Sequence, residues 1–286
     1  MSLGFRSLAL VAALSVTAGI TVAGAPSSNA APVPAICSER SDGGPRVAFG
    51  LTADQRLICF KVSRPGVSRT LFATTGLVAP DVALLGIDIR PSNGVIYGLG
   101  DGGGVYALDL VEGRPILKSR LNTALDGRFF GMDFNPTVDR LRVVSDRGQN
   151  LRINVDTGAT TVDAFVRNGT TRASGVAAVA YTNNDNDPST ATVLYDLDTV
   201  ADQLALQSPP NDGTLGAVGL LGFRGSAEAT FDIESTVVDG KTTDNMGYAA
   251  LDGGGAFFRI DLKTGSATFI ANLGMNRLTG LTFATA

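Results

Sequence analysis

The sequence predicts an all-β fold of the propeller class, in which four-stranded sheets are arranged around a central axis. Three observations predict it: a repeated strand motif, the regular spacing of that motif and a composition rich in turn-forming residues. The motif is a short apolar strand with one Asp that ends at a Pro turn, as in residues 85–91 and 130–136. Weaker copies occupy residues 179–183, 230–234 and 280–283.

The spacing of the copies matches the length of propeller blades. When the copies are aligned at Asp88, Asp133, Ala180, Asp232 and Thr282, successive copies are 45, 47, 52 and 50 residues apart. Propeller blades repeat every 40 to 50 residues or so. The 35 Gly, the 12 Pro and the charged fraction of 17% are typical of many short strands joined by tight turns.

Further strands follow each copy in the same order. We expect second strands at residues 95–97, 141–143, 193–195 and 246–248. Third strands are expected at 105–110, 151–155, 203–207 and 257–262, and fourth strands include 160–165 and 267–271. A blade is therefore predicted to contain four strands.

The two ends of the predicted domain complete each other. Residues 47–50 read as a second strand with no first strand before them, and residues 278–284 read as a first strand with nothing after it. Joined in one blade, they close the ring and remove its exposed edges. We expect one propeller domain over residues 47–286 with five four-stranded blades. The alternative is six blades, if residues 166–230 contain another one.

The first thirty residues have the pattern of a cleavable signal peptide. Arg6 precedes an apolar run over residues 8–22, and small residues at 28–30 predict cleavage before Ala31. The run is shorter than the roughly 20 residues of a spanning helix, so a retained anchor is the less favoured alternative and no stable membrane insertion is expected after cleavage. The sequence predicts an exported protein, extracellular or periplasmic, with residues 31–46 as an N-terminal segment.

Charge and cysteine content narrow the environment and the partners. Cys37 and Cys59 are the two cysteines, and in an oxidising compartment we expect them to form a disulfide; two buried thiols are the alternative. The formal net charge is −4 and no basic run occurs, which argues against a nucleic acid partner.

The central motifs also resemble a known family. Residues 134–146 and 148–152 are similar to the signature of the bacterial exported family called domain of unknown function 4394, and further matching motifs lie at 180–184, 194–198 and 209–215. The resemblance extends over about residues 47–286. It implies an exported, propeller-like domain and brings no established activity, so it assigns no catalytic role to any residue.

The sequence contains no His, which excludes Ser-His-Asp triads and His-ligated metals. Oxygen-liganded cations, calcium above all, are what remains. If first strands line the axis, Asp88, Asp133 and Asp232 converge there and form a candidate calcium site, because carboxylates brought together repel unless protonated or bridged by a cation. The alternative is that each Asp accepts backbone amides and fixes its own blade turn.

A second candidate site lies in the third blade, where polar residues share strand faces. Such a face needs partners in the neighbouring blade or a ligand, and forked guanidinium groups suit an anionic one. An inter-blade network of Arg with Asp and Asn is the alternative. The candidate ligand-binding residues are Arg140, Arg142, Asn150, Arg152, Asn154, Asn183 and Asn184. Asp156 shares the strand face of Asn150, Arg152 and Asn154, and the expected neighbours are Asp185, Asp187, Asn211 and Asp212. The loop at 183–187 is either a calcium-binding loop or, as we favour, a solvated turn.

No catalytic signature stands out, so we expect a non-enzymatic module that binds a small molecule, a polymer or a protein, or one associated with the cell envelope. The alternative is a hydrolase or lyase of carbohydrates that uses inner-strand carboxylates, with Glu234 as proton donor. The absence of Trp and the presence of only five Tyr argue against a sugar cleft. A third alternative is a purely structural envelope component.

Overall fold

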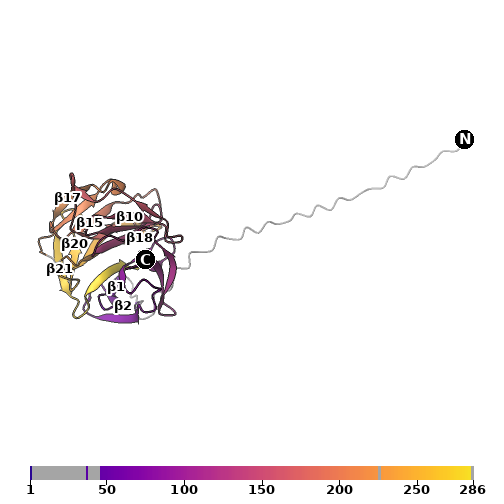
Figure 1. The fold of residues 1–286 in the computed structure, drawn as a ribbon, viewed down its shortest axis with the longest axis horizontal. Coiled ribbons are helices and arrows are strands. Elements are labelled where there is room, and N and C mark those ends of the chain that lie inside the picture. The colour runs from indigo at the N-terminus through magenta and orange to yellow at the C-terminus, as the bar shows by residue number, and fades with distance from the viewer. Residues whose placement is uncertain (2–36, 38–45, 225–226, 285–286) are drawn as a thin grey trace.

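The computed structural model describes Met1, Cys37 and residues 46–224 and 227–284 (Figure 1). In this part of the chain, five four-stranded antiparallel sheets surround a common centre, so the propeller and its five blades are confirmed. A two-stranded hairpin and one 3₁₀ turn, η1 (Pro210–Asp212), complete the regular structure. The predicted signal peptide and most of the N-terminal segment lie outside the described residues. No helix long and apolar enough to cross a membrane occurs among the described residues.

Each blade is one sheet whose first strand lies at the axis and whose last strand lies at the outside. Blade 1 comprises β22 (Leu278–Phe283), β1 (Val47–Thr52), β2 (Arg56–Lys61) and β3 (Ser68–Ala73), and blade 2 comprises β4 (Leu84–Arg90), β5 (Val95–Gly100), β6 (Gly104–Asp109) and β7 (Arg114–Arg120). Blade 3 comprises β8 (Phe130–Asn135), β9 (Arg140–Ser145), β10 (Asn150–Ile153) and β11 (Thr160–Val162), and the hairpin β12 (Arg167–Asn168) and β13 (Thr171–Arg172) follows it. Blade 4 comprises β14 (Val176–Tyr181), β15 (Leu194–Asp198), β16 (Gln203–Gln207) and β17 (Leu215–Leu220), and blade 5 comprises β18 (Thr230–Val238), β19 (Lys241–Leu251), β20 (Ala256–Ile260) and β21 (Ala267–Asn272).

The ring closes as the sequence predicts. β22, the last strand of the chain, pairs antiparallel with β1, with Ala48 opposite Phe283 and Gly50 opposite Leu281. Blade 1 is thus built from both ends of the domain, and Cys37 is linked to Cys59 of its β2 by a disulfide. The closure ties the first described strand to the last.

The innermost strands contact one another in the order β22, β4, β8, β14, β18 and back to β22. Glycine permits this close approach: a Cβ at Gly131 would lie 2.5 Å from the backbone nitrogen of Val179 in the next blade. A Cβ at Gly280 would lie 2.8 Å from the nitrogen of Ile87. Any side chain at these positions would push neighbouring blades apart.

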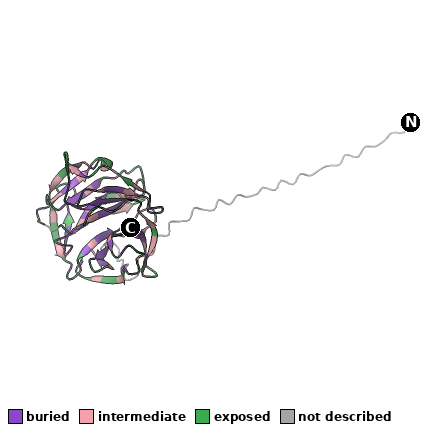
Figure 2. Cartoon of the chain, in the orientation of Figure 1, coloured by how far each residue is buried: buried purple, intermediate pink, exposed green. Residues whose placement is uncertain are grey.

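The apolar core is divided among the five interfaces between blades. One cluster of buried side chains lies between each pair of neighbouring blades, for example Phe49 and Leu57 against Ile87 and Tyr106 between blades 1 and 2. Burial is greatest on the inner strands and decreases toward the outer ones, as Figure 2 shows. The stacked faces of the blades therefore hold the ring together.

Candidate functional site

The three aspartates expected at the centre do converge there. Asp88 lies on β4, Asp133 on β8 and Asp232 on β18, and one carboxylate oxygen from each lies within 4.8 Å of the others. All three are buried, with at most 5% of their surface exposed. Thr282 of β22 and Ala180 of β14 occupy the two remaining equivalent positions. We call Asp88, Asp133 and Asp232 the aspartate cluster.

The polar side chains of this ring accept hydrogen bonds from the backbone of the next blade. Asp88 and Asp232 also accept the amide of the residue that follows each of them, at 2.8 and 2.6 Å. Thr282 donates to Asp88 at 2.9 Å. The amides accepted from the next blade are those of Phe134 by Asp88 (2.7 Å), Tyr181 by Asp133, Phe283 by Asp232 (3.1 Å) and Ile89 by Thr282 (3.1 Å). The cluster therefore joins neighbouring blades in addition to fixing its own strands.

Burial makes ionisation of this cluster costly. It raises the pKa of Asp88 to about 7. Burial and then the charges of Asp88 and Asp232 raise the pKa of Asp133 well above its ordinary value, and burial and the charge of Asp88 do the same for Asp232. A hydrogen bond between the side chains of Asp133 and Asp232 requires a proton on one of the two carboxyl groups. Protonation within the cluster would relieve the repulsion among the three carboxyl groups.

The same oxygens are the ones that could hold a cation. The three carboxylates and the Thr282 hydroxyl lie close together, and calcium takes 6–8 oxygen ligands in proteins. A cation would have to compete with the amides that these oxygens already accept. The calcium site therefore stays a prediction.

One end of the central axis is covered by a loop of blade 4. We call residues 183–192, between β14 and β15, the cover loop. Asn186 donates its side-chain amide to the Pro91 carbonyl of blade 2 at 2.7 Å, and Asp185 accepts the backbone amide of Thr242 in blade 5 at 2.8 Å. Blades 4 and 2 are not neighbours in the ring, so the loop crosses the axis at the end where the inner strands finish.

Two residues expected to bind a ligand hold this cover loop in place. The backbone amide of Asn183 donates to the side-chain oxygen of Asn245 on β19 at 3.0 Å, and the side-chain amide of Asn245 donates to the side-chain oxygen of Asn183 at 2.7 Å. The backbone amide of Asn184 donates to the Ser235 hydroxyl of β18 at 3.1 Å. Asn183 and Asn184 therefore contact blade 5, and among the described residues neither forms a hydrogen bond with Arg140, Arg142 or Arg152.

The opposite end, where the inner strands begin, carries an open hollow of about 180 Å³. Its walls are mainly apolar, with one cation and one anion. Below it, level with Gly86, Gly131 and Gly280, the axis narrows to a void of about 10 Å³, close to the smallest space that holds one water. We call the hollow the mouth, and its lining residues are Ala53, Leu84, Leu85, Arg128, Phe129, Phe130, Ala177, Glu228, Ala229, Leu278 and Thr279.

Arg142, one of the arginines expected to bind a ligand in blade 3, is buried. Arg142 is 1% exposed and donates to Tyr181, Asn150, Asp163 and Asn211 at 2.7 to 3.2 Å. These partners come from blades 3 and 4 and from η1. Arg142 thus joins two blades through a hydrogen-bonded network.

Asp163 is the shared anion of this network. Arg152 donates to both of its oxygens, at 2.7 and 2.9 Å, and Arg142 donates to one of them. Although burial opposes ionisation, the hydrogen bonds from Arg152 and Arg142 hold the pKa of Asp163 below its usual value. The structure therefore brings Arg142, Asn150 and Arg152 together; their role in ligand binding stays a prediction.

Two other candidate residues lie elsewhere in blade 3. Asn154 follows β10, which ends earlier than the sequence pattern predicts, and its side chain accepts the backbone amide of Asp156 at 3.0 Å. Arg140 donates to the backbone carbonyl of Asp139 at 2.8 Å. Asn154 lies in the turn that follows Ile153, beyond the strand face of Asn150 and Arg152. Among the described residues, Arg140 forms no hydrogen bond with the Arg142 network.

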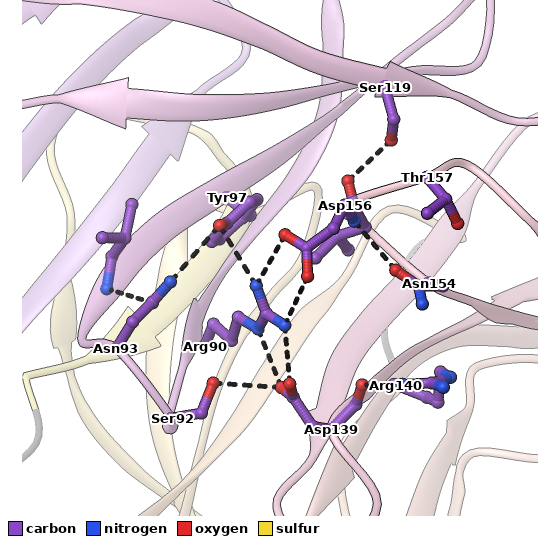
Figure 3. A network of polar contacts seen from close by, with 12 residues as sticks. Arg90, Ser92, Asn93, Tyr97, Ser119, Asp139, Arg140, Asn154, Asp156 and Thr157 are labelled. Atoms are coloured by element: carbon purple, nitrogen blue, oxygen red, sulfur yellow. Dashed lines mark hydrogen bonds and ion pairs between the residues drawn. The ribbon is translucent and has the colours of Figure 1, made fainter.

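Sequence reasoning missed the ion pairs that surround Arg90. This residue ends β4, and its guanidinium donates to both oxygens of Asp139 at 2.8 and 2.6 Å and to both oxygens of Asp156 at 3.0 and 2.9 Å (Figure 3). The two acids belong to blade 3, so Arg90 ties it to blade 2. Arg90 stands directly before the Pro that ends a repeat copy, but nothing in the sequence indicates which acids come near it.

Asp196 is a second residue that the sequence did not single out. It lies on β15 with no exposed surface, and neither carboxylate oxygen has a hydrogen-bond partner among the described atoms. Burial raises its pKa well above the ordinary value, while the charge of Arg142 acts in the opposite direction. Burial therefore favours the neutral form of this carboxyl group, and the nearby positive charge of Arg142 opposes that effect.

The repeated strands and the sites built on them belong to a recognisable sequence family. The pattern of the domain of unknown function DUF4394 matches residues 56–282. The chain belongs to this family. No match was found among curated proteins. Membership of DUF4394 agrees with the resemblance seen in the central motifs.

Several solved structures are similar to this DUF4394 chain at low identity. A structural genomics protein of unknown function from Bacteroides thetaiotaomicron VPI-5482 is 17% identical, with 83% of this chain and 57% of that chain covered and a TM-score of 0.49. An auxiliary nutrient binding protein from the same organism is 13% identical, with 82% and 59% covered and a TM-score of 0.47. BamB from Moraxella catarrhalis is 16% identical, with 78% and 57% covered and a TM-score of 0.35. The chain spans less than two thirds of each of these proteins.

Proposed function

We propose that this DUF4394 chain is an exported, non-enzymatic binding module that takes its ligand at the mouth of the propeller. The observation that carries the proposal is the difference between the two ends of the axis. The mouth is open, apolar and flanked by Arg128 and Glu228, while the cover loop lies across the other end. Concave sites with mainly apolar walls and a few polar groups are the usual form of ligand sites.

The aspartate cluster supports binding over catalysis. Its carboxyl groups lie below the narrowing at Gly86, Gly131 and Gly280, and their oxygens accept hydrogen bonds from backbone amides. A substrate held in the mouth would meet apolar side chains, Arg128, Glu228 and Thr279. These residues can bind a ligand through apolar contacts and charge, but they do not include an activated nucleophile paired with a base.

The alternative of a carbohydrate hydrolase needs two carboxyl groups beside the same bond. The aspartate cluster supplies the number of groups but is buried, and Glu234 is only 6% exposed and pairs with Arg46. The geometry favours binding for this reason. A panel of polysaccharides and aryl glycosides, with Asp133→Asn as the control, tests hydrolysis directly.

Export is proposed on the sequence of the first thirty residues and is consistent with the disulfide that links Cys37 to Cys59. Disulfides persist in oxidising compartments and are rare in the cytosol. Separation of the cell fractions of the producing bacterium, followed by mass determination of the N-terminus, tests it. Cleavage before Ala31 supports export; an uncut chain in the cytosol contradicts it.

The binding proposal is tested with the oxidised protein and a panel of small metabolites, oligosaccharides and short peptides, followed by thermal unfolding. A ligand in hundredfold excess over its dissociation constant stabilises the folded state by about 2.7 kcal/mol. Ala53 is exposed at the wall of the mouth, so Ala53→Trp should fill the hollow and abolish the shift.

Ala201→Trp is the matched control, because Ala201 is exposed in the corresponding turn of blade 4 and does not line the mouth. It should leave the ligand-induced shift unchanged. If no compound in the panel stabilises the wild type, or if Ala53→Trp binds as well as Ala201→Trp does, the mouth is not the binding site.

A further inference from the structure

We infer that the ligand of the mouth is amphipathic: a small apolar body that carries an anionic group, either a carboxylate or a phosphate. The inference rests on the proposed binding at the mouth and adds the chemistry of the ligand. It is carried by the position of Arg128, by the arginines that surround it and by the size of the hollow.

Arg128 presents its charge at the wall of the mouth. Its side chain is exposed and its guanidinium lies 5.1 Å from the centre of the Phe129 ring, within the range of a cation–π contact. No carboxylate of the described residues lies within ion-pair distance of it. The backbone amides of Arg128 and Phe129 donate to Asp146 at 2.8 and 3.3 Å, which fixes this part of the wall.

Two further arginines share one acid beside this wall. Arg147 lies 3.0 Å from one oxygen of Asp126, and Arg172 lies 3.6 Å from the other. Among the described residues, Asp126 pairs with these two arginines, and Asp146 accepts the two backbone amides without forming an ion pair with the Arg128 guanidinium. Three arginines therefore accompany two acids at this rim. This rim is locally positive although the whole protein carries a formal net charge of −4.

The acid at the mouth has its own cation. Glu228 lies 3.4 Å from the guanidinium of Arg277, which also donates to the Gly253 carbonyl at 2.9 Å. A ligand anion would therefore meet Arg128 as the available partner at the mouth. Forked guanidinium groups bind carboxylates and phosphates through two parallel hydrogen bonds.

The hollow sets the size of the apolar part. Its volume of about 180 Å³ is smaller than the roughly 300 to 1,000 Å³ of sites that enclose a drug-sized ligand. It suits a short aliphatic chain or a single ring, packed against Leu84, Leu278 and Phe130. The anionic group then lies at the rim beside Arg128.

A titration with four compounds that share one apolar chain tests the inference: hexanoate, hexyl phosphate, hexanol and hexylamine, followed by chemical-shift changes of methyl groups. We expect both anions to bind at least tenfold more tightly than hexanol and hexylamine. Arg128→Gln should weaken binding of the anions about tenfold, the size of one charge-assisted hydrogen bond, and Arg128→Lys should restore part of the loss. Hexanoate and hexyl phosphate compared with each other identify the anionic group.

Arg259→Gln is the matched control, since Arg259 is exposed on β20 and does not line the mouth. It should change nothing. The inference is overturned if hexanol binds as tightly as the anions, if Arg128→Gln leaves binding of the anions unchanged, or if none of the four compounds binds. The proposed function survives each of these results as long as a compound from the wider panel binds and Ala53→Trp abolishes it.

Discussion

The two ends of the central axis are built from different kinds of residue. The end where the inner strands finish holds Asp88, Asp133 and Asp232 and is crossed by the cover loop. The end where they begin is open, with mainly apolar walls and Arg128 at the rim. The closed end has the larger concentration of polar side chains, yet those side chains are already hydrogen-bonded within the protein.

Because of this difference, we expect some substitutions to change the free energy of unfolding and others to change ligand binding. Polar groups that join neighbouring blades, in the aspartate cluster and around Arg142, should affect unfolding when they are changed. Residues of the mouth, such as Ala53 and Arg128, are exposed and should affect binding with little change in unfolding. The predictions below test this separation.

The largest loss of stability is expected for Arg142→Met. The substitution removes one partner of a buried ion pair and leaves Asn150, Asn211 and Tyr181 without their donor. Breaking a buried pair in this way costs about 3–5 kcal/mol. Denaturant unfolding measures the cost, with Arg152→Met as the partly exposed comparison. Equal, small losses for the two variants would contradict a structural role for Arg142.

The next effect is a dependence of stability on pH from the aspartate cluster. The folded-state pKa of Asp88 is about 7 against an ordinary value of 3.8, so the folded protein binds a proton that the unfolded chain has released. The contribution of this proton to stability is fully present below pH ~4 and is lost as the pH rises toward 7. The raised pKa values of Asp133 and Asp232 add to this loss.

Asp133→Asn should reduce this loss. Asparagine keeps an acceptor for the Tyr181 amide and gives a permanent donor to Asp232, so it imitates the protonated acid. Thermal unfolding at pH 5 and pH 8 measures the effect: the wild type should lose more stability between these values than the variant. If the wild type and the variant lose the same stability between pH 5 and pH 8, protons bound to the aspartate cluster are not the cause of the pH dependence.

Calcium distinguishes protons from a cation at the same place. If the predicted calcium site exists, calcium in hundredfold excess over its dissociation constant stabilises the wild type by about 2.7 kcal/mol, EGTA reverses the gain and Asp133→Asn abolishes it. If the wild type unfolds at the same temperature with calcium and with EGTA, calcium does not bind the cluster. Protonation is then what relieves the repulsion among its carboxyl groups.

The smallest loss of stability is expected in the cover loop. Asn186 has a backbone φ of 60°, a conformation that glycine also adopts, so Asn186→Gly removes the hydrogen bond to Pro91 without adding strain. The expected loss is about 1 kcal/mol. Hydrogen exchange of the loop amides should become faster while that of the β14 amides stays unchanged. Faster exchange throughout the domain would contradict this local role.

The fold was largely predictable because its strands repeat. Aligning Asp88 with Asp133 and Asp232 placed the inner strands at equivalent positions, and equivalent positions on a ring converge at its axis. The closure of blade 1 followed from the unmatched motifs at the two ends of the domain.

The partners of polar residues and the position of the mouth were not predictable in the same way. Asp163 meets Arg142 from the end of another strand, and Asp156 meets Arg90 across a blade interface, so no sequence spacing connects them. The mouth is lined by residues such as Leu84 and Ala177, which a sequence pattern cannot tell from core. Which end of the axis is open depends on the path of the cover loop.

The most direct test of the account is to block the two ends of the axis separately and measure ligand-induced stabilisation with the same compound panel. Ala53→Trp fills the open mouth, and Ser189→Trp places the same bulk on an exposed position of the cover loop. If the ligand binds at the mouth, binding is lost in Ala53→Trp and retained in Ser189→Trp. Binding that survives Ala53→Trp and disappears in Ser189→Trp would place the ligand at the other end and contradict it.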